Sequence, residues 1–371
     1  MIWTPSTRGG TVGAILDGAR RSNREKESTV KITTIGIDLA KTTLSVHGVD
    51  DNGKVVLRKS MSRSKLLEIM ANREPCLVGM EACGGAHDLA RRLIAMGHRA
   101  RLMAARFVQP YRKSQKNDGN DAEAICEAVA RPNMRFVPVK SAEQQALLSV
   151  HRVRLQLIET RTALINQLRG LLAEFGILMP KGRYQLRTHA TPALEHPDLP
   201  ELARTVLKEL NTRIQALDIE ILSQDRRIEA YARDNVLAQR LIAICGIGPI
   251  SASAIVASVG DAKLFKNGRQ FCAWLGLVPR QYSTGGKARL GRITKRGDVY
   301  LRTLLVHGAR SALNVLAKRT DRLSTWIQSL SARRGYKKAI VALAAKNARI
   351  AWAVLATGKP YEPRGCAQAA Q

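Results

Sequence analysis

The hydrophobic pattern changes twice along the chain and divides it into three regions. Between Ile32 and Ala130, short apolar runs such as ITTIGIDLA and CLVGMEA alternate with amphipathic segments such as GAHDLARRLIAMG. The runs LSVHGV and KVVLRKS flank the turn DDNG and are typical of a β-hairpin. We expect Gly97 to end one helix and Asn120 to cap the helix NDAEAICEAVA. A hairpin followed by alternating strands and helices predicts an α/β domain with a mixed sheet over residues 31–140.

A heptad-like rhythm replaces this alternation between residues 141 and 236. Two apolar stripes at steps of three and four residues predict two long helices, separated by a loop rich in proline. The first stripe holds Val150, Val153, Leu157, Leu164, Leu168, Leu171 and Phe175, and the second holds Leu207, Leu210, Ile214, Leu217, Ile221, Ile228 and Tyr231. Arg161 and Gln224 interrupt them. Such narrow stripes are typical of a coiled-coil hairpin or of a coiled coil between chains, and equally of an ordinary helical-bundle core.

The third region, residues 237–371, is helical, punctuated by glycine and basic. Its run LIAICGIGPISASAIVASVG has the form helix, turn, helix. In a helix-hairpin-helix, Gly246 and Gly248 would let backbone N–H groups face a phosphate; the alternative is a tight turn between core helices. The run is uncharged and long enough to span a membrane, but CGIGP would break a spanning helix. We therefore expect no membrane partner and a cytoplasmic, nucleoid-associated protein.

The charge balance narrows the class of partner. Sixty Lys and Arg against thirty Asp and Glu give a formal net charge of +30, which favours a polyanion such as nucleic acid. Aromatic residues make up only 4%, so we expect binding through phosphates and shape rather than a surface that stacks on bases. Residues 1–30 are expected to be a mobile basic leader. The six cysteines show no C-x-x-C spacing, so no zinc module is predicted.

Four acidic residues stand out against this cationic background. Asp38 lies near the end of the first strand run, Glu81 ends a later one, and Asp118 and Asp121 lie at the start of a helix. Each alone is typical of a turn or a cap, but their order is that of a ribonuclease-H-like nuclease core. Because clustered carboxylates repel one another, we expect Mg²⁺ ions between them. Two such ions would clamp the attacking and leaving oxygens of a phosphodiester.

Several motifs in fixed order give the chain a family resemblance. GIDLAK, GMEACGG, KNDGNDAEAI, CGIGPISA, FCAWLGLVPRQYSTGGKARLGRITKRGD and YLRTLL resemble successive blocks of the DEDD transposases of the IS one-ten family, from Ile35 to Tyr361. The resemblance implies a RuvC-like N-terminal domain, a coiled-coil helical insert and a C-terminal transposase domain. It also implies an element-encoded bridge RNA that pairs with donor and target DNA. Family members assemble on that RNA as homo-oligomers, and we expect a dimer or a tetramer.

The resemblance also gives a role to the segment QYSTGGKARLGRITKRGD. Family members carry a serine before the loop glycine, and this serine attacks DNA to form a phosphoseryl link. Here Thr284 directly precedes Gly285, and Ser283 lies one position earlier. Position favours Thr284 as the nucleophile, whereas the primary hydroxyl of Ser283 meets less steric resistance. We expect the neighbouring cations to hold backbone phosphates: Arg280, Lys287, Arg289, Arg292, Lys295 and Arg296.

Two other functions stay open at this point. A RuvC-like junction nuclease would use metal-activated water and would form no covalent link to DNA. A non-catalytic, basic, DNA-binding architectural protein would show neither cleavage nor a link. A protein–DNA adduct that survives denaturation separates a recombinase from both.

Overall fold

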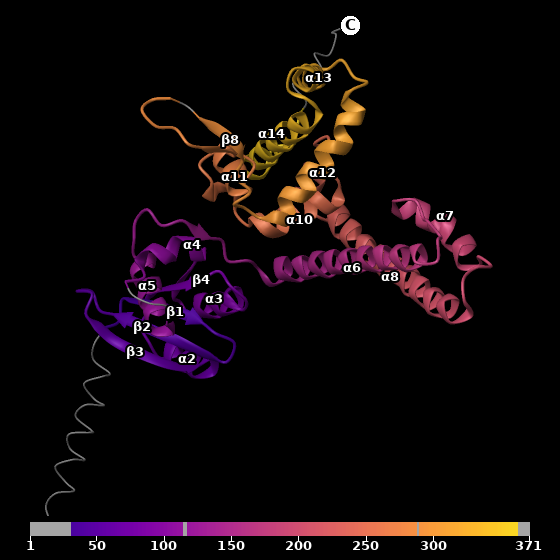
Figure 1. The fold of residues 1–371 in the computed structure, drawn as a ribbon. Helices are drawn as coiled ribbons and strands as arrows, with labels where there is room; N and C mark the ends of the chain where they lie inside the picture. The colour runs from indigo at the N-terminus through magenta and orange to yellow at the C-terminus, as the bar shows by residue number, and fades with distance from the viewer. Residues whose placement is uncertain (1–30, 114–116, 288, 363–371) are drawn as a thin grey trace, which may run out of the picture. The chain divides into compact units, whose positions relative to one another are not determined.

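The computed structural model describes residues 31–113, 117–287 and 289–362, and the chain divides into two compact units after Ser141 (Figure 1). The first unit holds a mixed sheet, and the second is mainly helical. The long helices and the C-terminal helices share this second unit, whereas the sequence predicted a separate insert and C-terminal domain. The predicted leader, residues 1–30, lies outside the described residues.

A six-stranded sheet in the order β3-β2-β1-β4-β5-β6 forms the first unit. The parallel strands are β1 (Thr34–Leu39), β4 (Leu77–Glu81) and β5 (Arg99–Met103). The strands β2 (Thr43–Val49) and β3 (Val55–Ser62) form the predicted hairpin, and β6 (Phe136–Val137) pairs antiparallel with β5. The predicted α/β fold with a mixed sheet is confirmed, and it fits a RuvC-like domain.

Helix α5 (Asp118–Val129) packs on one face of this sheet because two glycines permit a close approach. A Cβ atom at Gly36 would lie 2.2 Å from the carbonyl oxygen of Ala122, and one at Gly79 would lie 2.7 Å from the Cβ of Val129. The other helices of the unit are α2 (Arg63–Ala71), α3 (Ala86–Ala95), the short α4 (Ala105–Val108) and the 3₁₀ turn η1 (Gln109–Tyr111).

The prediction for the N-cap of α5 is wrong by one turn. Asn117, not Asn120, caps the helix, and its side-chain oxygen accepts a hydrogen bond from the backbone N–H of Asn120 at 2.8 Å. Asn120 is thus the residue being capped, because the helix already begins at Asp118. The predicted end of α3 is confirmed, since Gly97 adopts the left-handed φ of 90°.

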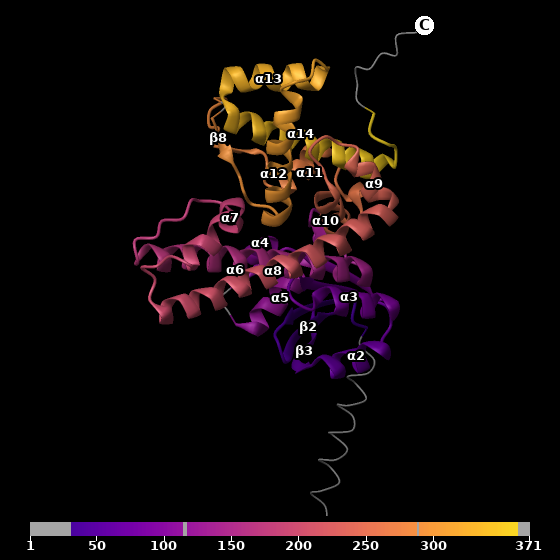
Figure 2. The ribbon, with the colours of Figure 1, turned by 90° about the vertical axis from the view of Figure 1, so that its right-hand side faces the viewer.

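Two long helices begin the second unit and lie side by side, α6 (Ala142–Ala173) and α8 (Glu201–Asp234), with the shorter α7 (Arg183–Leu194) between them in sequence (Figure 1, Figure 2). They pack on each other within one chain as an antiparallel hairpin. The second apolar stripe is mostly buried there, at Leu207, Leu210, Ile214, Ile221 and Ile228. The first stripe is buried at Leu168 but exposed at Val153, Leu171 and Phe175. Most of the second stripe is therefore intrachain core.

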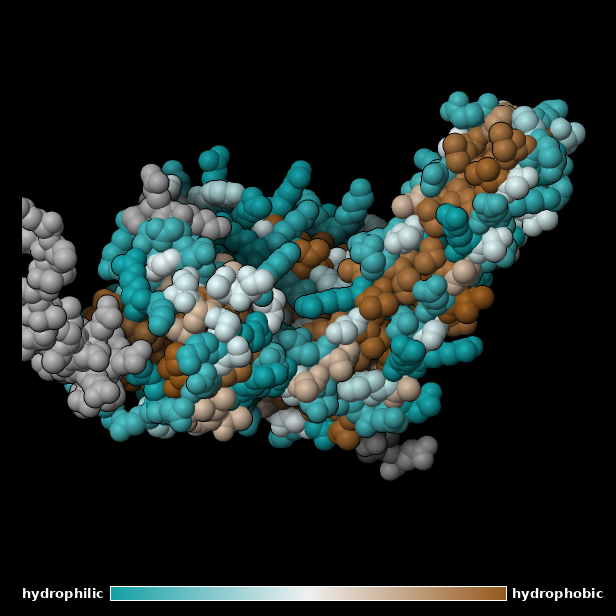
Figure 3. Space-filling view, turned by 90° about the horizontal axis from the view of Figure 1, so that it is seen from below, coloured by the Kyte–Doolittle hydropathy of each residue, from teal (hydrophilic) through white to brown (hydrophobic). Residues whose placement is uncertain are grey.

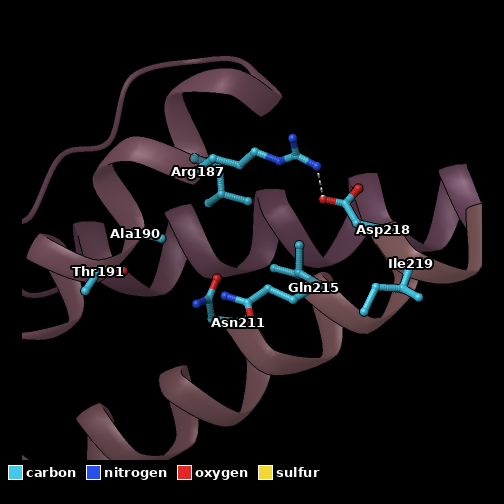
Figure 4. A pocket seen from close by; sticks show the side chains of 9 residues that line it. Arg187, Ala190, Thr191, Asn211, Gln215, Asp218 and Ile219 are labelled. Atoms are coloured by element: carbon cyan, nitrogen blue, oxygen red, sulfur yellow. Dashed lines mark hydrogen bonds and ion pairs between the residues drawn. The ribbon is translucent and has the colours of Figure 1, made fainter. Parts of the chain in front are cut away.

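A buried ion pair explains the interruption of the first stripe. Arg161 donates to the carboxylate of Asp218 on α8 at 2.6 Å, and the Arg161 residue is 8% exposed. Arg187 on α7 contacts the other oxygen of the same carboxylate at 3.2 Å, and Figure 4 shows it reaching across to Asp218. One carboxylate thus joins all three helices of this module.

The remaining helices of the second unit surround α14 (Tyr336–Thr357). They are α9 (Val236–Ile242), α10 (Pro249–Val259), α11 (Gly268–Trp274), α12 (Val299–Leu316) and α13 (Arg322–Arg334), with the 3₁₀ turn η2 (Ala262–Leu264). In the described part of the chain, α14 is the one helix long and apolar enough to cross a membrane. Its residues Leu343, Ala344 and Ala348 are fully buried in the core of this unit. The apolar run from Leu241 to Gly260 is broken at the glycines, as predicted.

Candidate active site and nucleic-acid interface

Asp38 and Glu81 lie next to each other on neighbouring parallel strands. The preceding residues, Ile37 and Met80, are paired in register, so the two acidic residues follow at the same level near the carboxyl ends of β1 and β4. Side chains alternate along a strand, so both lie on the face of the sheet that α5 covers, as do Gly36 and Gly79 two residues earlier. Both acidic residues are half-buried.

The pKa of the nearby Cys83 thiol is affected by the negative charge of Asp38 and Glu81. Burial is the main cause that raises the pKa of Cys83, and the carboxylates of Glu81 and Asp38 raise it further. Two negative charges therefore lie close enough to the thiol to disfavour a third.

Helix α5 runs antiparallel to β1 and points its first turn toward this edge. Cys126 Sγ donates to the carbonyl oxygen of Thr34 at 3.7 Å, and Ala122, one turn earlier, lies against Gly36. One helical turn before Ala122, the N-terminal end of α5 lies further along β1, in the direction of Asp38. The positive end of the helix dipole is thus directed at the carboxylate edge.

The two remaining acidic residues lie in that first turn and differ in surroundings. Asp121 is half-buried and accepts a hydrogen bond from Arg112 at 3.2 Å, whereas Asp118 is exposed. Among the described residues, no group of three or more His, Cys, Asp or Glu is placed to hold a metal ion. We expected the four carboxylates to form one set of metal ligands, and the structure does not bring them together in this way. Like charges repel, and Arg112 neutralises Asp121 instead.

The segment with the two hydroxyls forms a hairpin between β7 (Pro279–Gln281) and β8 (Leu290–Ile293). At its tip, Thr284 pairs with Lys287, whose backbone N–H donates to the Thr284 carbonyl at 3.1 Å. The two central residues, Gly285 and Gly286, have positive φ angles of 55° and 75°. A tight turn of this kind requires such angles at both positions, which explains the glycine pair.

The two candidate nucleophiles are used differently by this hairpin. Ser283 Oγ accepts hydrogen bonds from the side chain of Gln281 at 3.0 Å and from the backbone N–H of Arg289 at 3.2 Å. Among the residues that the structure describes, the hydroxyl of Thr284 makes no hydrogen bond. The hairpin thus engages the oxygen of Ser283 and leaves that of Thr284 accessible.

The predicted phosphate-binding cations are all exposed on the hairpin or at its base: Arg280, Lys287, Arg289, Arg292, Lys295 and Arg296.

The base of the hairpin is anchored tightly. A Cβ at Gly297 would lie 1.9 Å from the Trp274 carbonyl oxygen, and Arg302 donates to the carbonyls of Leu275 and Gly297. Sequence reasoning missed Arg302, although it lies in the motif YLRTLL, because an arginine in a helix gives no local sign that it is buried.

The glycine turn between α9 and α10 is held by two other helices. A Cβ at Gly308 on α12 would lie 1.9 Å from the Gly246 carbonyl oxygen, so both positions require glycine. Asn347 on α14 is fully buried and donates to the Cys245 carbonyl at 2.8 Å. Helix α10 then begins after Gly248 with no side-chain cap. Gly308 and Asn347 were not found from the sequence, since they lie far from the turn along the chain.

A buried polar network lies in the same unit and was also missed. His151 on α6 shares hydrogen bonds with the hydroxyl of Tyr300 on α12 at 2.9 Å and with that of Ser253 on α10 at 3.1 Å. Burial, and then the cation of Arg154, lower the pKa of His151 to about 4. A neutral imidazole therefore ties three helices together.

Two family models match separate stretches of the chain. The family model for DEDD transposases of IS110 type matches residues 35–177, and the model Transposase IS116/IS110/IS902 family matches residues 238–323. A relative from Pseudomonas aeruginosa named "Probable family 20 transposase" is 52% identical over 338 residues, which are 90% of this chain and 100% of the relative.

Two further relatives are transposases of named insertion sequences. The transposase for insertion sequence element IS1328 of Yersinia enterocolitica is 43% identical over 330 residues, covering 89% of this chain and 98% of the relative. The transposase for insertion sequence element IS1111A of Coxiella burnetii is 41% identical over 340 residues, covering 91% and 93%. The chain therefore belongs to the IS110 family of DEDD transposases and is a DNA recombinase enzyme.

Proposed function

We propose that the protein excises and inserts its own element by Mg²⁺-dependent cleavage and transfer of DNA strands through a hydroxyl nucleophile. The observation that carries the proposal is the side-by-side placement of Asp38 and Glu81 near the carboxyl ends of paired parallel strands. The first turn of α5, with Asp118 and Asp121, points toward the same edge. Acidic residues from three separate elements have little reason to share one edge unless cations lie among them.

The chemistry of these donors fits a hard divalent cation. Mg²⁺ prefers carboxylate oxygens, and Asp38 and Glu81 with Asp118 and Asp121 would hold it. When bound, Mg²⁺ neutralises the charge that develops on the phosphodiester oxygens. Arg112 now holds Asp121 by a hydrogen bond at 3.2 Å, so a cation bound there would compete with Arg112 for this carboxylate.

Thr284 is our preferred nucleophile. Its oxygen forms a bond to the scissile phosphorus, the bond from phosphorus to the sugar oxygen of the leaving strand breaks, and the hydroxyl proton passes to that oxygen through solvent. Ser283 is the alternative, but its oxygen accepts two hydrogen bonds that hold the hairpin in shape. The exposed cations of the hairpin stabilise the phosphate as its charge grows.

Double-stranded DNA, donor and target, is held through its phosphates in this proposal. The hairpin cations supply charge, and the uncapped start of α10 beside Gly246 and Gly248 supplies backbone N–H groups as in a helix-hairpin-helix. Guidance by a bridge RNA rests on the family resemblance alone. The proposed nucleoid-associated, cytoplasmic location is supported by the net charge of +30, which favours nucleic acid.

Assembly as a dimer or tetramer has some support in the long-helix pair. Figure 3 shows apolar surface along the pair α6 and α8. In this region of the chain, Leu202 and Ile219 on α8 are 80% and 71% exposed, and Leu178, which follows α6, is 82% exposed. Large exposed apolar residues gathered on one module are typical of an interaction surface.

The test is a covalent adduct with DNA. Purified protein with its copurified RNA is incubated with end-labelled element DNA and Mg²⁺, and the products are separated after denaturation. We expect a labelled band at the mass of the protein, absent when Mg²⁺ is chelated and absent for Asp38→Asn. Cleavage without an adduct would indicate a nuclease that uses water, and binding without cleavage would indicate an architectural protein. Sequencing the copurified RNA tests the guide.

A further inference from the structure

A cleft beside the carboxylate edge combines aromatic rings with arginines. Strand β5 ends at Met103, which pairs with Glu81 on β4, and the chain continues directly into α4 and η1. These two short elements and the turn before β6 surround a cavity of about 410 Å³, whose lining includes Phe107, Tyr111 and Arg135. The elements that line the cleft therefore come directly after the carboxyl end of β5, the strand that pairs with β4 at Glu81.

Charge and ring faces lie together in this cleft. The guanidinium of Arg106, which lines the cleft, lies 4.8 Å from the centre of the Phe107 ring and keeps positive charge beside it. Arg131 does not line the cleft and pairs with Glu127, and its guanidinium lies 6.0 Å from the centre of the Tyr111 ring. Arg135 is exposed and, within the described residues, makes no ion pair. A ligand with both a flat π-face and a negative charge matches this lining.

We propose that the cleft binds one unpaired nucleotide of the DNA strand that is cut at the Asp38 and Glu81 edge. A base stacks on the rings of Phe107 and Tyr111, and Arg135 contacts the neighbouring phosphate. The nucleotide must be unpaired because the faces of paired bases are covered by their neighbours in the duplex. The inference rests on the proposed cleavage function, since it assigns the strand in the cleft to that reaction.

The cleft is connected to the acidic residues through Arg112, the residue after Tyr111 in the chain. Tyr111 is followed directly by Arg112, whose guanidinium donates to Asp121 at 3.2 Å. Occupation of the cleft can therefore change the position of Arg112 and the charge felt by Asp121. From the low aromatic content we expected binding through phosphates rather than a surface that stacks on bases. The proposal departs from that expectation for a single nucleotide, because two rings line one cleft.

The experiment compares single-stranded and duplex DNA of one sequence. Binding of a fluorescein-labelled single strand of about ten nucleotides, and of the corresponding duplex, is measured by anisotropy for the full chain and its variants. Tyr111→Leu and Phe107→Leu keep apolar packing but remove the ring face. We expect each to weaken single-strand binding about tenfold while duplex binding changes less than about twofold. Arg135→Ala should weaken single-strand binding and lower its salt slope by about one.

Tyr336→Leu is the matched control, because it removes a partly exposed ring from the other unit. A second measurement does not depend on how variants fold: the wild-type protein is crosslinked by light to a single strand carrying 5-iododeoxyuridine. We expect the attached peptide to contain Phe107 or Tyr111. The proposal is overturned if both ring variants bind the single strand like wild type, if duplex binding falls equally, if only RNA binding falls, or if crosslinks map elsewhere.

Failure of the cleft and failure of the proposed function give different results. Asp38→Asn should lose cleavage and keep both the crosslink and single-strand affinity. If the wild-type protein cuts DNA but the ring variants bind normally, the cleft is not a nucleotide site. If crosslinks map to the cleft but no cleavage occurs, the proposed reaction is wrong, and with it the assignment of the bound strand to that reaction.

Discussion

The guanidinium of Arg112 lies 3.2 Å from the carboxylate of Asp121, and both side chains are half-buried. This pair places a protein cation on one of the four acidic residues that we assign to the metal. In the proposed site, a metal ion and Arg112 would compete for the same carboxylate. The competition gives the proposed site a measurable signature.

Removing the charge of Arg112 should ease metal binding. We expect Arg112→Gln to lower the Mg²⁺ concentration needed for half-maximal strand cleavage by several-fold, because the competing cation is gone. Lys113→Gln is the control, since Lys113 pairs with Glu123 at 3.0 Å outside the acidic quartet. The measurement is a Mg²⁺ titration of cleavage. An unchanged Mg²⁺ requirement in Arg112→Gln would show that the ion pair does not compete with the cation.

The hairpin predicts different outcomes for its two hydroxyls. Thr284→Ala should abolish the covalent adduct, because it removes the attacking oxygen. Ser283→Ala should keep most of the adduct and lose only the hydrogen bonds from Gln281 and Arg289. Both variants are assayed with the same labelled DNA after denaturation. The opposite result would assign the attack to Ser283, and a faster Thr284→Ser variant would show that the threonine methyl slows the reaction.

Affinity for DNA should depend steeply on salt. With a net charge of +30, we expect log affinity to fall linearly with log salt concentration. Lys287→Gln and Arg289→Gln should each reduce that slope by about one, because each removes one phosphate contact. Titrations at four or more salt concentrations measure the slope. If the double variant kept the wild-type slope, the hairpin would not bind phosphates.

A buried and an exposed position on the two long helices allow stability and assembly to be tested separately. Leu168 is fully buried within the chain, so Leu168→Asp should destabilise the helical unit by about 3 kcal/mol or more. Ile219 is 71% exposed, so Ile219→Asp should change stability by no more than about 0.5 kcal/mol and should weaken the oligomer. Thermal unfolding and light scattering measure the two effects. A fully oligomeric Ile219→Asp protein would exclude this surface from the interface.

Burial of His151 predicts loss of stability in acid. Its pKa is lowered to about 4 in the folded unit, against about 6.5 when unfolded, so only the unfolded chain takes up a proton between these values. Stability is therefore full above pH 6.5 and falls as the pH drops toward 4, by about 3 kcal/mol at most. Urea unfolding of wild type and His151→Gln at pH 7 and pH 5 tests this. A wild-type loss no greater than that of the variant would rule out His151 as the cause.

The strands, the long helices and the acidic residues could be predicted from the order of the amino acids alone. Alternation over short apolar runs predicts strands because side chains on a strand point alternately to opposite faces. This alternation puts Asp38 on the same face of its strand as Gly36, and Glu81 on the same face as Gly79, whereas the pairing register that brings Asp38 and Glu81 to one level is set by the fold. The glycine pair at 285 and 286 predicts a turn because few other residues adopt positive φ. These features depend on local chemistry, which the chain carries without its fold.

Which distant residues contact one another follows from the packing of the whole fold. Arg161 interrupts an apolar stripe in the sequence, but its partner Asp218 lies 57 residues away on another helix. His151 meets Tyr300 across 149 residues, and the rings of Phe107 and Tyr111 come from two short elements that no apolar periodicity marks. Such contacts depend on how helices and strands pack, because burial and neighbouring charges are set by the whole fold. The interrupted stripe thus indicated a charged residue at an apolar position, and only the packing of α8 on α6 shows that Asp218 is its partner.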